Sequence, residues 1–106
     1  LFNVVSVDNV LAHILDEVYV GAFYSSQLDI LSKAVAAKPN ENVGAFFRDG
    51  DRIRIREYSE SSDDPEKSPL GNICNHLFSA SFVEFIGSRE LPFHEAKKKI
   101  PYTDAD

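Results

Sequence analysis

The chain contains no tryptophan, no methionine and a single cysteine, Cys74. One cysteine excludes an internal disulfide and favours a reducing, cytoplasmic compartment. Basic side chains are also scarce, because 11 Lys and Arg residues stand against 17 Asp and Glu residues and the formal net charge is −6. This balance argues against a protein that binds nucleic acid or coats an anionic membrane, since either would present a basic surface to phosphate groups.

Long apolar runs are absent as well. No segment approaches the roughly 20 apolar residues that a membrane-spanning helix needs. The first residues, Leu1 to Val5, include neither an initiating Met nor the basic leader of a signal peptide, and they already have the pattern of a strand. We therefore expect a piece of a longer protein. Its 106 residues, 43% of them hydrophobic, are enough for one globular unit with a core.

The first part of the chain predicts two strands with a helix between them. Residues 1–7 form a nearly continuous apolar run with many β-branched side chains, which is typical of a strand buried on both faces of a parallel or mixed sheet. The run ends at Asp8-Asn9. Helical spacing of apolar residues follows over 16–27, with Asp16 as the N-cap, and 28–37 has the pattern of another strand.

A β-hairpin is predicted next. Two strand-like runs, 43–48 and 52–56, flank Asp49-Gly50, a dipeptide that favours the tight turn of a hairpin. Arg and Ile alternate in the second run. We therefore expect that strand to lie half in water.

The rest of the chain begins with a tract at about 59–68 that has no apolar residue, so we expect a mobile acidic loop there. Ser81 and Glu84 have the spacing of a capping box ahead of a short helix, which Gly87 would end. Residues 92–99, with Pro at the start and three lysines at the end, predict a last helix. Strands that alternate with helices, together with one hairpin, indicate an α/β fold with a mostly parallel, mixed sheet.

Asp8-Asn9 is the first candidate site, because ligands of open α/β sheets bind beyond the carboxyl ends of the strands. A carboxylate can hold a hard cation such as Mg²⁺, and an amide can both donate to and accept from a sugar or a base. The alternative is that either residue only makes the turn or caps the next element.

The second candidate is the stretch 71–76, GNICNH, in which two amides and an imidazole lie between apolar residues. Buried amides must be hydrogen-bonded, so these side chains either fix their own loop or await a polar ligand. Cys74 has the character of a small core residue more than of a nucleophile. His13, His76 and His94 lack the spacing of a zinc site, and the chain has no glycine-rich phosphate loop.

Five sequence blocks occur in order along the chain. They are VDN at 7–9, VGAFF at 43–47, EYSE at 57–60, GNICNH at 71–76 and HEAKKKIPYTD at 94–104. Together they resemble the central part of eukaryotic UDP-N-acetylglucosamine pyrophosphorylases, within the wider uridylyltransferase family that also contains UDP-glucose and UDP-sugar pyrophosphorylases. The resemblance covers nearly the whole chain.

The resemblance implies that residues 1–106 are a partial catalytic domain, a fragment of a Rossmann-like nucleotidyltransferase fold. It also implies a reaction in which UTP and N-acetylglucosamine 1-phosphate give UDP-N-acetylglucosamine and pyrophosphate, with Mg²⁺ as cofactor. The sugar phosphate would attack the α-phosphorus in line, so the protein would mainly position the reactants and neutralise charge. Asp8 would be the catalytic carboxylate that associates with the metal, and Asn9 would contact the sugar nucleotide.

The fragment would supply the sugar-binding side of the site. By position in the motifs, Gly44 would let backbone lie against the sugar, because it has no side chain. Glu57 would accept hydrogen bonds from sugar hydroxyls, and Tyr58 would line the pocket. Asn72 would bond the sugar or its N-acetyl group.

The chain also departs from the family's pattern. The family's glycine-rich basic nucleotide loop, a phosphate-binding lysine and further sugar-pocket aromatics have no counterpart in it, and the tract 61–68 is shorter than in relatives. We therefore expect residues 1–106 alone to be inactive and to self-associate through an unpaired apolar first strand. Two alternatives stay open: a UDP-sugar or UDP-glucose pyrophosphorylase, and a non-catalytic sugar-nucleotide-binding domain.

Overall fold

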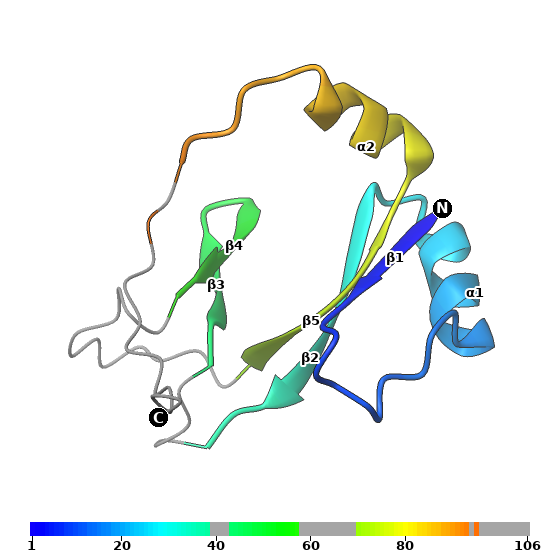
Figure 1. Cartoon of the computed structure of the whole chain (residues 1–106), viewed down its shortest axis with the longest axis vertical. Coiled ribbons are helices and arrows are strands. Elements are labelled where there is room, and N and C mark those ends of the chain that lie inside the picture. The colour runs from blue at the N-terminus through cyan, green and yellow to red at the C-terminus, as the bar shows by residue number, and fades with distance from the viewer. Residues whose placement is uncertain (39–42, 58–69, 94, 96–106) are drawn as a thin grey trace, which may run out of the picture.

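The computed structural model describes residues 1–38, 43–57, 70–93 and 95 (Figure 1). Along the chain, the elements are β1 (Phe2–Val5), α1 (Glu17–Ser26), β2 (Ile30–Ala36), β3 (Ala45–Asp49), β4 (Arg52–Arg56), β5 (Leu70–Phe78) and α2 (Ala80–Gly87). Within these described ranges, no helix combines the length and the apolar character needed to cross a membrane.

Strand β5 organises the sheet. It pairs with β2 along its whole length, from Leu70 opposite Ala36 to Phe78 opposite Ile30. Its other edge is shared by β1, which pairs with residues 75–78, and by β3, which pairs at Gly71. Strand β4 extends the sheet beyond β3. Strands β1 and β3 thus lie end to end beside β5, and the interval between them faces residues 72–74.

Every pairing in this sheet is antiparallel, so the prediction of a mostly parallel sheet was wrong. The apolar run 1–7 suggested a strand buried on both faces, but β1 is four residues long and its burial alternates. Val4 is 45% exposed and Val7 is 99% exposed. The apolar run extends to Val7, beyond the end of β1 at Val5. Because of this extra length, the sequence pattern resembled that of a central strand in a parallel sheet.

The stretch 71–76 is part of β5 and is not a loop. The sequence pattern did not predict this strand, because polar residues interrupt its apolar alternation. The strand is irregular at Cys74, which has φ +50°, and the register with β2 shifts between Ser32 and Ala34. A bulge of this kind breaks the period-two alternation on which strand prediction depends.

Helix α1 covers one face of the sheet, and its N-cap is Asp16, as predicted. The Asp16 carboxylate accepts the backbone N–H of Tyr19 at 3.0 Å. Tyr19 and Phe23 of the helix bury against Leu77 of β5, which is 0% exposed. The Tyr19 hydroxyl lies 2.7 Å from the carbonyl oxygen of Leu31, so the phenol is hydrogen-bonded where it enters the core.

The predicted hairpin is confirmed as β3 and β4, with Gly50 in the turn at φ +61°. Only residues without a Cβ adopt such a φ at little cost, which explains the glycine. Arg54 forms an ion pair with Asp49 at 2.8 Å, and the Arg56 guanidinium lies 4.5 Å from the centre of the Phe47 ring. Strand β4 is more exposed than expected, because Ile53 is 66% and Ile55 42% exposed and only Arg56 is partly buried.

The helix predicted after Ser81 exists, but it begins earlier. Its N-cap is Ser79, whose hydroxyl accepts the backbone N–H of Phe82 at 3.1 Å. Gly87 is its last residue, as predicted. The acidic tract 59–68 lies outside the described residues, as does most of the helix predicted over 92–99, of which the described residues are not helical.

Candidate functional site

The described segments that carry predicted site residues meet where β1 ends and β3 begins, beside the same part of β5. The backbone N–H of Ser6 donates to the carbonyl oxygen of Cys74 at 3.1 Å, which fixes the chain just before Asp8. The backbone N–H of Asn72 donates to the carbonyl oxygen of Gly44 at 2.7 Å. Two segments far apart in sequence are therefore bonded to positions only two residues apart on the central strand.

Asp8 lies in an exposed turn directly after this junction. The Ser6 hydroxyl donates to its Oδ1, and this bond holds the pKa of the Asp8 carboxyl below its ordinary value. Asn9 is partly buried, and its backbone N–H donates to the carbonyl oxygen of Ser6 at 3.3 Å. Both residues do form a turn, but neither caps α1, which is the role of Asp16. The carboxylate of Asp8 is left ionised and open to solvent.

Gly44, Glu57 and Asn72 lie together on the other side of the junction. A Cβ placed on Gly44 would be 3.7 Å from a carboxylate oxygen of Glu57, and Asn72 is bonded to Gly44 as described above. The Asn72 Oδ1 accepts the backbone N–H of Cys74 at 3.0 Å. Because its oxygen is engaged, Asn72 presents its Nδ2 group as a donor, and that group has no partner among the described residues.

This cluster therefore has complementary hydrogen-bonding groups. Glu57 is exposed and contributes acceptor oxygens, Asn72 contributes a donor, and Gly44 leaves its backbone uncovered by a side chain. Such a set matches the hydroxyl and amide groups of an amino sugar. Tyr58, the remaining predicted residue, lies outside the described part of the chain.

A metal at this place would have few protein ligands. Among the described residues, no group of three or more His, Cys, Asp or Glu side chains could hold an ion. Mg²⁺ is nevertheless commonly bound by one or two carboxylates together with substrate phosphates and water. The single ionised carboxylate of Asp8 fits that arrangement, in which a nucleotide would supply most of the ligands.

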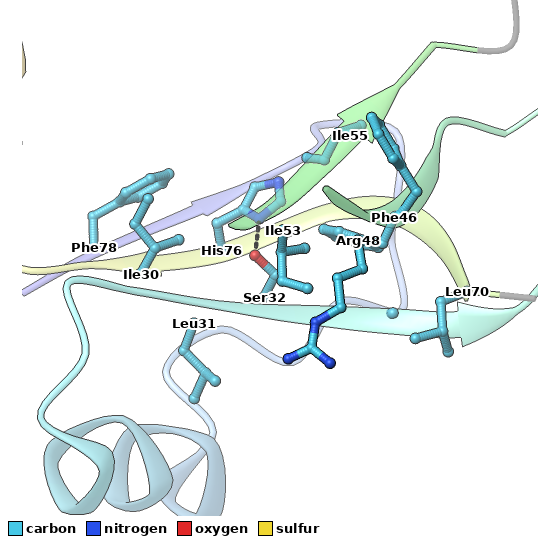
Figure 2. Close-up of a pocket in the computed structure, with 12 residues that line it drawn as sticks. Ile30, Leu31, Ser32, Phe46, Arg48, Ile53, Ile55, Leu70, His76 and Phe78 are labelled. Carbon is cyan, nitrogen blue, oxygen red and sulfur yellow. Dashed lines mark hydrogen bonds between the residues drawn. The ribbon is translucent and has the colours of Figure 1, made fainter. Parts of the chain in front are cut away.

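A separate groove lies on the sheet face opposite α1 (Figure 2). It has a volume of about 670 Å³, and its walls come from β2, β5 and the β3–β4 hairpin. Its lining is mostly apolar, and at its centre the Ser32 hydroxyl lies 2.7 Å from Nδ1 of His76. Burial lowers the pKa of the His76 imidazole, so its neutral form is favoured.

Sequence reasoning missed two partly buried polar pairs: Ser32 with His76 in the groove, and Asn3 with Asn75 on the α1 face. Asn75 had a signal, since an amide inside an apolar stretch implies a partner. Asn3 and Ser32 could not be paired with anything before the antiparallel register of β5 was known.

Several relatives of the chain bear the name UDP-N-acetylglucosamine pyrophosphorylase. A protein of Encephalitozoon cuniculi named "Probable UDP-N-acetylglucosamine pyrophosphorylase" is 54% identical over 101 residues, which is 95% of this chain and 30% of that protein. The Saccharomyces cerevisiae UDP-N-acetylglucosamine pyrophosphorylase is 32% identical over 112 residues, which is 93% of this chain and 24% of that protein. No protein-family model matches the chain.

A solved structure agrees as well. The structure titled "Crystal structure of putative UDP-N-acetylglucosamine pyrophosphorylase from Entamoeba histolytica" superimposes with a TM-score of 0.65 and 29% identity. The superposition covers 82% of this chain and 24% of the Entamoeba chain.

The chain is a homologue of one segment of UDP-N-acetylglucosamine pyrophosphorylases. The resemblance found in the sequence blocks is thereby confirmed. The chain spans less than a third of the length of these relatives, at 30% and 24% of the two curated proteins. The fold is a small α/β arrangement with an antiparallel sheet that is similar to the solved pyrophosphorylase-like structure.

Proposed function

We propose that this chain is the sugar-binding part of a uridylyltransferase that converts UTP and N-acetylglucosamine 1-phosphate to UDP-N-acetylglucosamine and pyrophosphate. The observation that carries the proposal is the cluster of Gly44, Glu57 and Asn72 beside the turn that holds Asp8. Homologues named for this activity align with nearly the whole of the chain.

On the sugar side, the chain's own groups account for binding and orientation. The carboxylate of Glu57 accepts from sugar hydroxyls, and the Nδ2 group of Asn72 donates to a sugar oxygen or to the N-acetyl carbonyl. Gly44 allows close approach of the ring, because a side chain there would occupy the space beside Glu57. Tyr58 follows Glu57 directly and is proposed to line the same pocket. Fixed polar partners of this kind place the sugar phosphate for in-line attack.

On the phosphate side, Asp8 is the proposed ligand of Mg²⁺, and Asn9 beside it is proposed to contact the sugar nucleotide. Bound with the nucleotide, Mg²⁺ would neutralise charge that develops on the transferring phosphoryl group. The Ser6 hydroxyl keeps the Asp8 carboxyl ionised and oriented. Since the barrier is lowered mainly by position and charge, the chain needs no nucleophile or general base of its own for this step.

The finer organisation belongs to the same proposal. We infer that residues 1–106 are part of a catalytic domain of Rossmann-like nucleotidyltransferase type, to which β5 and its partners contribute an antiparallel portion. The single cysteine, Cys74, favours a reducing, cytoplasmic compartment. The uracil and the triphosphate would then be held by other parts of a longer polypeptide.

Sugar preference tests the proposal. The full-length protein should release pyrophosphate from UTP much faster with N-acetylglucosamine 1-phosphate than with glucose 1-phosphate at equal concentrations. A protein that prefers glucose 1-phosphate would instead be a glucose-specific or broad-specificity relative. Binding of UDP-N-acetylglucosamine without turnover would indicate a non-catalytic sugar-nucleotide-binding domain.

A further inference from the structure

The loop that carries Asp8 is closed at its far end by a side chain of the strand from which it departs. The backbone N–H of Leu15 donates to Oδ1 of Asn3 at 3.0 Å. Asn3 lies within β1, and the loop leaves that strand at Ser6, so this bond ties the returning chain back to its origin.

The Asn3 side chain is itself held by β5. Its Nδ2 group lies 3.2 Å from Oδ1 of Asn75 and 3.2 Å from the carbonyl oxygen of His76. Asn75 is only 3% exposed, and its own carbonyl oxygen lies 3.0 Å from the hydroxyl of Tyr19 in α1. The amide of Asn3 therefore cannot rotate without breaking bonds to a buried partner.

Leu15 needs this support. Its φ is +52°, a conformation that is uncommon for a residue with a branched side chain. Its side chain is 54% exposed, so apolar packing does not explain why the backbone is held this way. The hydrogen bond to Asn3 is the interaction that fixes the return of the loop at this residue.

We propose that Asn3 is a positioning residue for the metal-associated carboxylate, acting through Leu15 and the closed loop. With the loop fixed by Ser6 at one end and by Asn3 at the other, Asp8 keeps one orientation toward a divalent cation and the nucleotide phosphates. The inference rests on the proposed role of Asp8. Residues that do not touch a metal but orient the side chains that bind it commonly affect metal affinity.

Two variants of Asn3 test this positioning role in the full-length protein. Asn3→Leu has nearly the same size but neither accepts from Leu15 nor donates to β5. Asn3→Asp loses the donor to β5 and sets a carboxylate oxygen against the Asn75 Oδ1 and the His76 carbonyl oxygen, so it should also release the loop. Ser32→Ala is the control, because it removes a side-chain hydrogen bond on the opposite face of the sheet.

Two measurements read the effect. Hydrogen exchange of the backbone amides of residues 6–15, in metal-free protein, reports loop closure, and the Mg²⁺ concentration at half-maximal rate reports the use of metal. In Asn3→Leu, exchange should be about tenfold faster and the Mg²⁺ requirement about tenfold higher, with the KM for sugar phosphate unchanged. Asn3→Asp should shift in the same direction, and Ser32→Ala should resemble the wild type in both.

Three results would overturn the inference. The first is faster exchange in Asn3→Leu with an unchanged Mg²⁺ requirement. The second is an Asn3→Asp protein with faster exchange over residues 6–15 and an unchanged Mg²⁺ requirement, a result that decides the matter even if Asn3→Leu does not fold. The third is an Asp8→Asn protein with normal Mg²⁺ dependence, which would refute the proposed role of Asp8 as well, whereas the first two leave that role standing.

Discussion

The backbone N–H of Asn72, in the central strand, donates to the carbonyl oxygen of Gly44, just before β3, at 2.7 Å. This bond holds the start of the hairpin against β5 and brings the carboxylate of Glu57, at the end of β4, beside Gly44. Gly44, Glu57 and Asn72 come from three separate sequence blocks and thus lie together. The order of these blocks along the chain does not by itself require this grouping.

Gly44 and Gly71 should respond differently to the same substitution. A Cβ on Gly44 would meet its neighbours at 3.5 Å or more, which is ordinary contact, so Gly44→Ala should fold with its stability nearly unchanged. A Cβ on Gly71 would lie 3.0 Å from Cγ2 of Val43, so Gly71→Ala should lose about 1–3 kcal/mol of unfolding free energy. Urea unfolding measures both.

The activity of Gly44→Ala then tests its proposed place against the sugar. Its kcat/KM for N-acetylglucosamine 1-phosphate should fall about tenfold, while its KM for UTP stays close to that of the wild type. A stable Gly44→Ala protein with normal sugar kinetics would remove Gly44 from the sugar pocket.

Asp8 and Asp16 form a matched pair for separating a metal ligand from a helix cap. Asp8→Asn in the full-length protein should lower kcat steeply and leave the melting temperature nearly unchanged, because the lost charge acts on the transferring phosphoryl group. Asp16→Ala should do the reverse, with a loss of about 0.5–2 kcal/mol of stability and near-normal kcat, because it removes the N-cap of α1. Kinetics and thermal melting of both proteins give the comparison. If Asp8→Asn lost stability and kept its kcat, Asp8 would be only a structural residue.

His76 should make stability depend on pH below neutrality. Burial lowers the pKa of its imidazole from the ordinary 6.5, so the unfolded chain binds a proton at a pH where the folded chain does not. The contribution of this neutral imidazole is fully present above pH 6.5 and is lost as the pH falls toward the lowered folded-state pKa. Urea unfolding over this range should show a larger loss for the wild type than for His76→Gln. An equal loss in both proteins would mean that His76 is not responsible.

Residues 1–106 on their own should release no pyrophosphate from UTP and sugar phosphate, because the groups proposed to hold the uracil and the triphosphate are not among them. The first strand is not unpaired as expected, because β1 pairs with β5. Association should still occur, since the loop after β1 exposes large apolar side chains, with Val10 and Leu11 each 90% exposed. Light scattering measures the association, and a denatured sample is the control for turnover. A clean monomer at high concentration, or turnover above the control, would contradict these expectations.

The sequence predicted the elements whose signals are local. Asp16 begins a helix because its carboxylate can accept a backbone N–H three residues ahead, and Asp49-Gly50 makes a hairpin because Gly50 accepts a positive φ. Both depend on a few adjacent residues, so both could be read from the chain without knowledge of tertiary structure.

The sheet direction and the central strand depend on distant residues, and there the prediction failed. β5 contains Asn75 and His76, whose side chains bond to Asn3 and Ser32 on other strands, and Asn72, whose Oδ1 accepts the N–H of Cys74 within β5. The bulge at Cys74 also breaks its alternation. Without β5 the pairing of β1 could not be deduced, and its apolar sequence favoured the wrong, parallel arrangement. The resemblance named candidate site residues, but the grouping of Gly44, Glu57 and Asn72 near the junction of β1 and β3 required the fold.

The most direct test of the proposed sugar site compares the two substrates in Glu57→Ala and Asn72→Asp. Asn72→Asp keeps the oxygen that accepts the N–H of Cys74 and loses the Nδ2 donor, so the irregular part of β5 at Cys74 should stay intact. We expect each variant to lose about 1–3 kcal/mol of transition-state binding to the sugar phosphate, roughly tenfold or more in kcat/KM, with the KM for UTP nearly unchanged. A parallel loss for UTP and sugar phosphate, or no loss for either, would contradict the assignment of this chain to the sugar-binding side.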